Sequence, residues 1–114
     1  MADADLERAL EPLRAAYRRK LPGRLAQLGA LLGRARDPHG TQQLEAAREL
    51  AHTLKGTSGS YGLNDVSVEL GRIEEHLVRL LEGAPADSAD LWEDIERALM
   101  RAGDRLESPR DGPA

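Results

Sequence analysis

The side chains best suited to chemistry gather in one short segment of this sequence, AHTLKGTSGSYGL at residues 51–63. On a helix with 3.6 residues per turn, Lys55 lies on the same face as His52. Gly56 and Gly59 follow that histidine by about one and two turns. A glycine inside a helix costs about 1 kcal/mol relative to alanine, so two of them beside one imidazole need a reason. We infer that they leave the backbone bare so that a large group can approach the histidine.

An exposed histidine beside a cation and bare backbone suits phosphoryl transfer. A neutral imidazole nitrogen is a good nucleophile near pH 7, because the reference pKa of histidine is about 6.5. The ammonium group of Lys55, three residues from His52, can offset the negative charge of a phosphoryl group. The metal ion that neutralises the charge of the moving group can come with the partner.

These residues need a scaffold, and the sequence predicts one of the all-α class. Apolar residues recur three or four positions apart nearly everywhere, and no segment alternates as a strand would. The first helix should cover about residues 4–34 and be kinked or briefly restarted at Pro12 and Pro22, because proline lacks the backbone donor. The later helices should begin at candidate N-caps, namely Thr41, Asn64 and Ser88.

Four amphipathic helices with short connections predict an antiparallel up-down-up-down four-helix bundle. In the second helix Leu50 and Leu54 point about 160° away from His52. Because those leucines should face the core, the histidine should face solvent. Gly62 fits the C-terminal end of this helix, where glycine is favoured.

The length of 114 residues suits a single domain. We expect residues 1–107 to form the bundle and residues 108–114, which lack apolar periodicity, to be a disordered tail. Met1 and this tail favour a free-standing protein, and the substrate domain of a larger kinase is the alternative.

The composition excludes several classes of protein. The chain has no cysteine, which rules out disulfides, thiolate metal sites and cysteine nucleophiles. No apolar stretch approaches the roughly 18 residues that a membrane span needs, and the acidic N-terminus does not resemble a signal peptide. We therefore expect a soluble, cytoplasmic protein that does not insert into a membrane.

The charge of the chain is negative overall but unevenly spread. The net charge of −4 argues against nucleic acid as the main partner. Residues 1–36 nevertheless hold eight Lys/Arg and four Asp/Glu, a balance of +4. This part includes a basic cluster, Arg18, Arg19, Lys20 and Arg24. The cluster either attracts an acidic protein surface or is an ordinary solvated helix face.

Other chemical sites find little support in the sequence. His39 lies in a turn, and His76 follows Glu74 and Glu75 without a second histidine or a cysteine, so we expect no metal site. The segment GTSGS lacks the final glycine and the preceding strand of a nucleophile elbow. It also lacks the Gly-Lys-Ser/Thr ending of a phosphate-binding loop. We therefore expect neither of these two enzyme sites.

The segment HTLKGTSGSYGL resembles the signature of the histidine-containing phosphotransfer (HPt) domain family. In that signature a His-x-x-Lys-Gly core is followed by small residues and a second glycine. The neighbouring segments AARELAHTLKG and KLPGRLAQL fit as well, whereas Thr57 and Tyr61 depart from the smaller and the aliphatic residue of many members. The resemblance covers most of the chain and implies an antiparallel four-helix bundle with the histidine exposed.

The resemblance also implies roles for particular residues. His52 would be the phosphoacceptor, Lys55 would assist the phosphoryl group, and Gly56 would permit docking of a receiver domain. We expect Arg48, Glu49 and Gly59 to surround the histidine on the docking face.

The partners implied are response-regulator receiver domains and a sensor or hybrid histidine kinase. The resemblance also implies a phosphocarrier and not an autonomous enzyme, with no ATP site and no self-phosphorylation. The chain itself would need no cofactor, because the receiver supplies the Mg²⁺. The short chain with a single acceptor face favours a monomer. The alternative is a helical adaptor that binds a partner without phosphotransfer, and the presence of both His52 and Lys55 favours the carrier.

Overall fold

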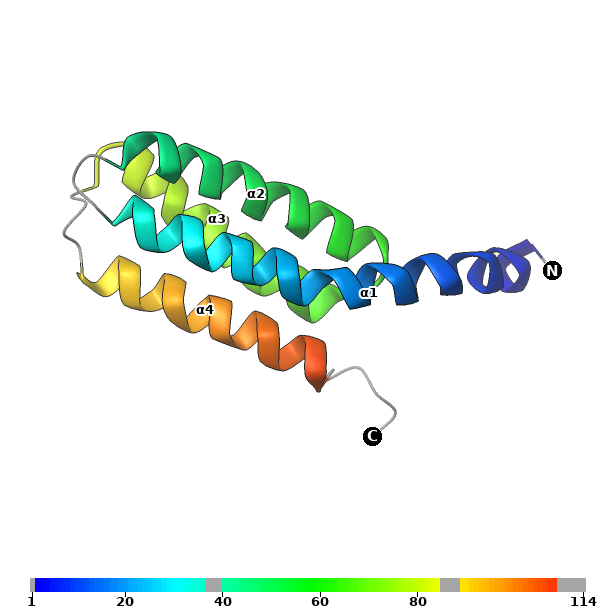
Figure 1. Cartoon of the computed structure of the whole chain (residues 1–114). Coiled ribbons are helices and arrows are strands. Elements are labelled where there is room, and N and C mark those ends of the chain that lie inside the picture. Colours follow the sequence, from blue (N-terminus) through cyan, green and yellow to red (C-terminus); the bar gives the residue numbers. More distant parts are fainter. Residues whose placement is uncertain (1, 37–39, 85–88, 109–114) are drawn as a thin grey trace.

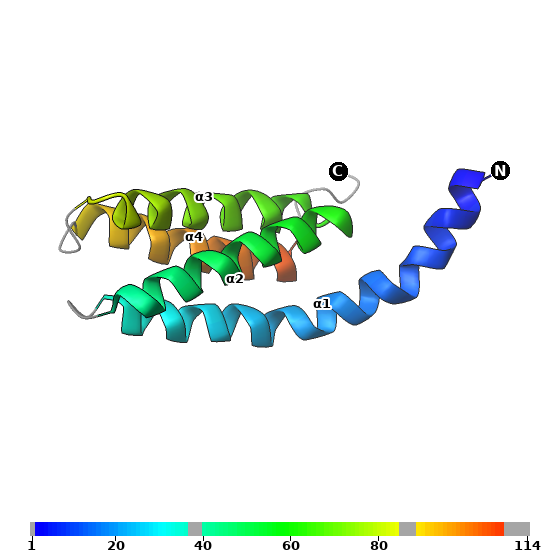
Figure 2. The same cartoon turned by 90° about the horizontal axis from the view of Figure 1, so that it is seen from above.

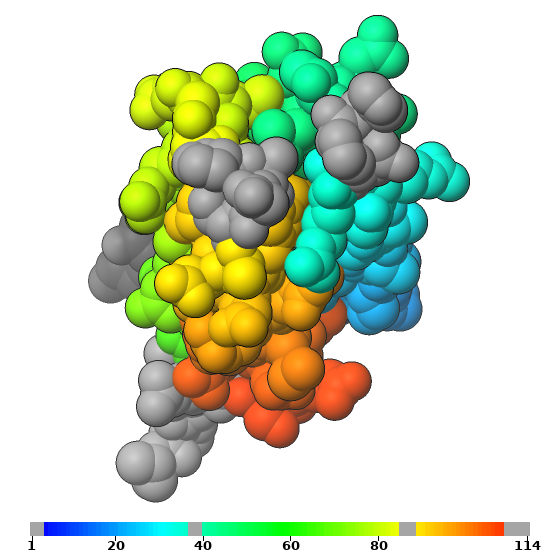
Figure 3. Space-filling view, turned by 90° about the vertical axis from the view of Figure 1, so that its left-hand side faces the viewer, coloured from blue at the N-terminus to red at the C-terminus, as the bar shows by residue number. Residues whose placement is uncertain are grey.

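The computed structural model describes residues 2–36, 40–84 and 89–108, which form four helices and no strand. The helices are α1 (Ala2–Ala35), α2 (Thr41–Ser60), α3 (Asn64–Leu81) and α4 (Ala89–Glu107). Each runs antiparallel to the one before it (Figure 1). Seen from the end opposite the N-terminus, the helices form a ring in which α1 lies beside both α2 and α4 (Figure 3). The expected all-α, up-down-up-down bundle is confirmed.

One hydrophobic core lies inside this ring, because apolar residues three and four positions apart share a helix face. Leu28 of α1 and Ile73 of α3 are fully buried in it. The residues that α2 and α4 bury there include four alanines, Ala47, Ala51, Ala98 and Ala102. This burial fixes which face of α2 lies at the surface.

The first helix is much longer than the helices it packs against, with 34 residues against 20 in α2. It runs through Pro12 and Pro22 without a break, so neither proline restarts it. It bends instead, and its N-terminal part turns away from the rest of the helix (Figure 2). Prolines bend a helix because they remove a hydrogen bond and crowd the preceding turn.

Polar contacts join α1 to the C-terminal end of α2. Arg14 donates from Nε to the carbonyl oxygen of Tyr61 at 2.7 Å, and the hydroxyls of Tyr17 and Ser58 are 2.9 Å apart. The rings of Tyr17 and Tyr61 pack with their centroids 5.2 Å apart. Burial raises the pKa of the Tyr17 phenol, which keeps the hydroxyl protonated. Residues 4–13 extend beyond these contacts into solvent (Figure 1).

Two backbone hydrogen bonds close the turn between α2 and α3, and this turn contains Gly62. Leu63 donates to the carbonyl oxygen of Ser58 at 2.8 Å, and Gly62 donates to that of Gly59 at 3.1 Å. Gly62 has φ = +79°, a conformation that glycine adopts without strain. This pattern is a Schellman motif, and it confirms Gly62 as the residue that ends the helix.

The expected N-caps are each shifted or untested. Gly40 rather than Thr41 caps α2, and Leu63 rather than Asn64 caps α3, so each expected cap is the first residue of its helix. The third candidate, Ser88, lies outside the described residues, as do residues 109–114 of the expected tail. Within the described ranges, no helix is long and apolar enough to cross a membrane.

Candidate functional site

The structure places His52 near the middle of α2, on the face opposite the core. Ala51 and Leu54 on either side of it are buried, whereas 67% of the His52 side chain is exposed. The helical period accounts for this arrangement, because residues one and two positions away from His52 are rotated by about 100° and 200°. The imidazole is therefore accessible to a macromolecule.

A glutamate of α3 holds the imidazole in place. Oε2 of Glu74 lies 2.7 Å from Nδ1 of His52, and its other oxygen lies 3.7 Å from Nζ of Lys55. An ionised carboxylate only accepts hydrogen bonds, so Nδ1 carries the hydrogen and the lone pair of the neutral ring is on Nε2. The Glu74 side chain is only 15% exposed, which fixes the carboxylate beneath the histidine.

The lysine is supported by α3 as well. A Cβ atom at Gly71 would lie 3.4 Å from Cε of Lys55, so the lysine stem crosses over bare backbone. One turn further along the helix pair, the Ser67 hydroxyl donates to the carbonyl oxygen of Lys55 at 2.9 Å. About half of the Lys55 side chain remains exposed, so its ammonium group, although paired with Glu74, is accessible to an anion beside His52.

The two glycines that follow the histidine differ in their surroundings. A Cβ atom at Gly56 would meet nothing within 4 Å, so the fold does not require glycine there. A Cβ atom at Gly59 would lie 3.4 Å from Oγ of Ser67, so this position faces α3 at van der Waals distance. Of these two glycines, only Gly56 would place an added Cβ atom in open space.

The remaining residues expected on the docking face lie on the preceding turn of α2. Arg48 is half-buried and Glu49 is exposed. Within the part of the chain that the structure describes, no hydrogen bond or ion pair joins either of them to His52. They lie near the histidine but are not part of the cluster around it.

Sequence reasoning missed Glu74 and treated it only as an acidic neighbour of His76. Its position could have been found from the antiparallel pairing of α2 and α3. Three facing pairs, His52 with Glu74, Lys55 with Gly71, and Gly59 with Ser67, are all centred on residue 63, in the turn. Antiparallel helices place residues equally far from their turn at the same level, so the position of the turn points to residue 74.

The other histidines lie apart from this cluster. Nε2 of His76 is 3.9 Å from a carboxylate oxygen of Asp94, so His76 faces α4. His39 lies outside the described residues. Among those that the structure does describe, no group of three or more His, Cys, Asp or Glu residues could hold a metal ion.

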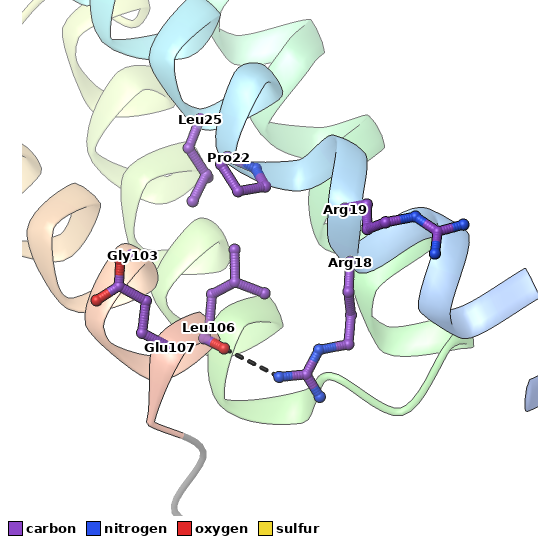
Figure 4. Close-up of a pocket in the computed structure, with 7 residues that line it drawn as sticks. All are labelled: Arg18, Arg19, Pro22, Leu25, Gly103, Leu106 and Glu107. Atoms are coloured by element: carbon purple, nitrogen blue, oxygen red, sulfur yellow. Dashed lines mark hydrogen bonds between the residues drawn. The ribbon is translucent and has the colours of Figure 1, made fainter.

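A cleft of about 410 Å³ lies between α1 and α4. It is lined by Arg18, Arg19, Pro22, Leu25, Gly103, Leu106 and Glu107 (Figure 4). Arg18 closes one side by donating from Nη2 to the carbonyl oxygen of Leu106 at 3.0 Å. Because only α1 and α4 line this cleft, His52 on α2 lies outside it. The histidine is thus an exposed side chain outside this cleft.

One comparison with known proteins identifies a family. The model of the Hpt domain family matches residues 12–108 of the chain. No curated protein and no solved structure gives a significant match.

Proposed function

We propose that His52 carries a phosphoryl group, because this chain belongs to the Hpt domain family, whose model matches residues 12–108. Members of this family transfer phosphoryl groups through a histidine in phosphorelays. The observation that carries the proposal is the geometry of the ring: an exposed imidazole with Nδ1 held by Glu74 and Nε2 free. The donor is a receiver aspartyl phosphate or a histidine kinase, and the acceptor is a receiver aspartate.

The step on His52 balances as a transfer between two nucleophiles. The Nε2 lone pair attacks phosphorus, the bond between phosphorus and the aspartyl oxygen breaks, and the aspartate leaves as a carboxylate. The hydrogen stays on Nδ1, where the Glu74 carboxylate offsets the positive charge that develops on the ring. The reverse step passes the group to the next aspartate. The receiver supplies the Mg²⁺ for both steps.

The proposed docking surface surrounds the histidine. Gly56 leaves room for the receiver directly beside His52, and Arg48, Glu49 and Gly59 form the edges of the contact. Lys55 reaches the phosphoryl oxygens from the same face. The test of the whole proposal is transfer from phosphorylated receiver domains to the wild type, with variants at the positions below.

Replacing Lys55 with alanine should slow transfer about tenfold without abolishing it. One charge-assisted hydrogen bond contributes about 1.5–3 kcal/mol, and partial exposure lowers that value at this site. The initial rate of transfer from a phosphorylated receiver measures the effect. Lys55→Arg keeps the charge and should restore most of the rate, whereas an unchanged rate in Lys55→Ala would remove the lysine from the mechanism.

Replacing Glu74 with alanine should also slow transfer about tenfold, because the ring loses the acceptor that orients it. A readout specific to this role is the tautomer of His52, seen in ¹⁵N NMR at a pH where the ring is neutral. The wild type should carry its hydrogen on Nδ1, and Glu74→Ala should shift it toward Nε2. Glu75→Ala, at the exposed neighbouring position, is the control and should change neither the transfer rate nor the tautomer of His52. An unchanged tautomer in Glu74→Ala would refute the role of Glu74.

A further inference from the structure

The N-terminal arm, residues 4–13 of α1, carries an apolar face that the bundle does not cover. The side chains of Leu6 and Leu13 are 59% and 53% exposed, and Leu10 between them is only partly buried. Their spacings of four and three residues put all three on one side of the helix. No hydrogen bond or ion pair within the described chain ties the arm to another helix. An isolated helix this short is marginal in water, which favours a partner that packs against it.

The charges along α1 change sign from one end to the other. The arm carries Asp5, Glu7 and Glu11 against a single cation, Arg8. The next part of the helix carries only cations, which are Arg14, Arg18, Arg19 and Lys20.

Several of these charges have no ion-pair partner within the described chain, namely Asp5, Glu7, Arg19 and Lys20. Figure 4 shows Arg18 turned toward the end of α4 and Arg19 pointing away from it. The acidic end and the basic end of α1 are both available for charges outside this chain.

We propose that the arm docks against the arm of a second copy of this chain, with the two helices antiparallel. A two-fold arrangement would place Leu6 near Leu13 of the second copy and Leu10 near its counterpart. In this register Asp5 of each arm would lie level with Arg14 of the other and between one and two turns from its Arg19 and Lys20, so the same attraction forms twice. A parallel pair would bring like charges together instead. The charge pattern therefore favours a second copy over an unrelated helix.

This interface lies apart from the His52 face, and it is the alternative to the monomer expected from the sequence. Two arms of ten residues bury much less than the about 800 Å² per partner of a standard interface. We therefore expect weak association, with a dissociation constant between about 1 μM and 1 mM.

Sedimentation velocity over a range of concentrations up to about 1 mM tests the proposal. The average mass of the wild type should rise above 12.4 kDa toward twice that value. Leu6→Glu combined with Leu13→Glu should stay monomeric. Val68→Glu combined with Met100→Glu changes two other exposed apolar residues and should behave as the wild type. A monomeric wild type, or a dimer that survives the arm variant, would overturn the proposal.

Charge exchange tests the antiparallel arrangement. Asp5→Lys with Glu7→Lys makes the arm basic, and Arg19→Glu with Lys20→Glu leaves the following segment without net charge, because Arg14 and Arg18 remain. Each double variant alone should self-associate less than the wild type, because the first brings like charges together and the second removes the attraction. An equimolar mixture of the two should associate more strongly than either variant alone, because the acidic arm of the second variant then faces the unchanged basic segment of the first. Double variants that associate as well alone as the wild type does, or a mixture that stays monomeric, would contradict the arrangement.

Discussion

The variant His52→Gln is expected to lose phosphotransfer by at least about 1,000-fold while keeping the fold, because no other group can take the place of Nε2. The side chain is two-thirds exposed, so glutamine fits without disturbing the core. Transfer of labelled phosphoryl groups from a receiver domain measures the loss. Thermal unfolding followed by circular dichroism checks the fold.

The control for this prediction is His76→Gln. His76 lies on α3 and faces Asp94 of α4, so its loss should leave transfer at the wild-type rate. Label retained on His52→Gln would show that another residue accepts the phosphoryl group.

The variant Gly56→Gln should lower transfer by about 100-fold or more and at the same time raise the stability of the bundle. The new side chain would extend from bare backbone one turn after His52, where nothing in the bundle lies within 4 Å of its Cβ atom. The receiver must occupy that space to reach Nε2. Glutamine has the better helix propensity, so the free energy of unfolding should rise by about 0.5 kcal/mol. Opposite changes in activity and stability distinguish blocked docking from damage to the fold.

Gly33→Gln is the matched control for this variant. Gly33 is also exposed on a helix with nothing within 4 Å of an added Cβ atom, but it lies on α1. The free energy of unfolding of Gly33→Gln should rise by a similar amount, and its rate of phosphotransfer should not fall. Gly56→Ala should fall between glycine and glutamine in its transfer rate. Wild-type transfer by Gly56→Gln would refute the steric role of this glycine.

The bundle could be predicted from the sequence because its signal is local. Apolar spacing of three and four residues marks Leu28 and Ile73 as core residues, and both are fully buried. The same spacing continues through Leu6 and Leu13, but both of these leucines are exposed. The pattern could not predict their exposure, because apolar periodicity does not show where the neighbouring helices end. A comparison of helix lengths would have shown that α1 extends beyond α2: at 1.5 Å per residue, α1 is about 51 Å long and α2 about 30 Å.

The candidate site was accessible to sequence reasoning only in part. The exposure of His52 and the position of Lys55 follow from the period of one helix. The contact of His52 with Glu74 depends on how α2 and α3 face each other, which is set by the turn at residues 61–63. The difference between Gly56 and Gly59 depends on the same packing, since only Gly59 faces Ser67.

The most direct test of the central claim is to locate the phosphoryl group. The wild type is incubated with a panel of receiver domains that have been phosphorylated by acetyl phosphate and Mg²⁺, and the product is mapped by mass spectrometry at alkaline pH and by ³¹P NMR. We predict one phosphoryl group, on Nε2 of His52, that is stable in base and lost in acid. A phosphoryl group on another residue, or none from any receiver while the protein is folded, would contradict the account, and the second result would favour a helical adaptor.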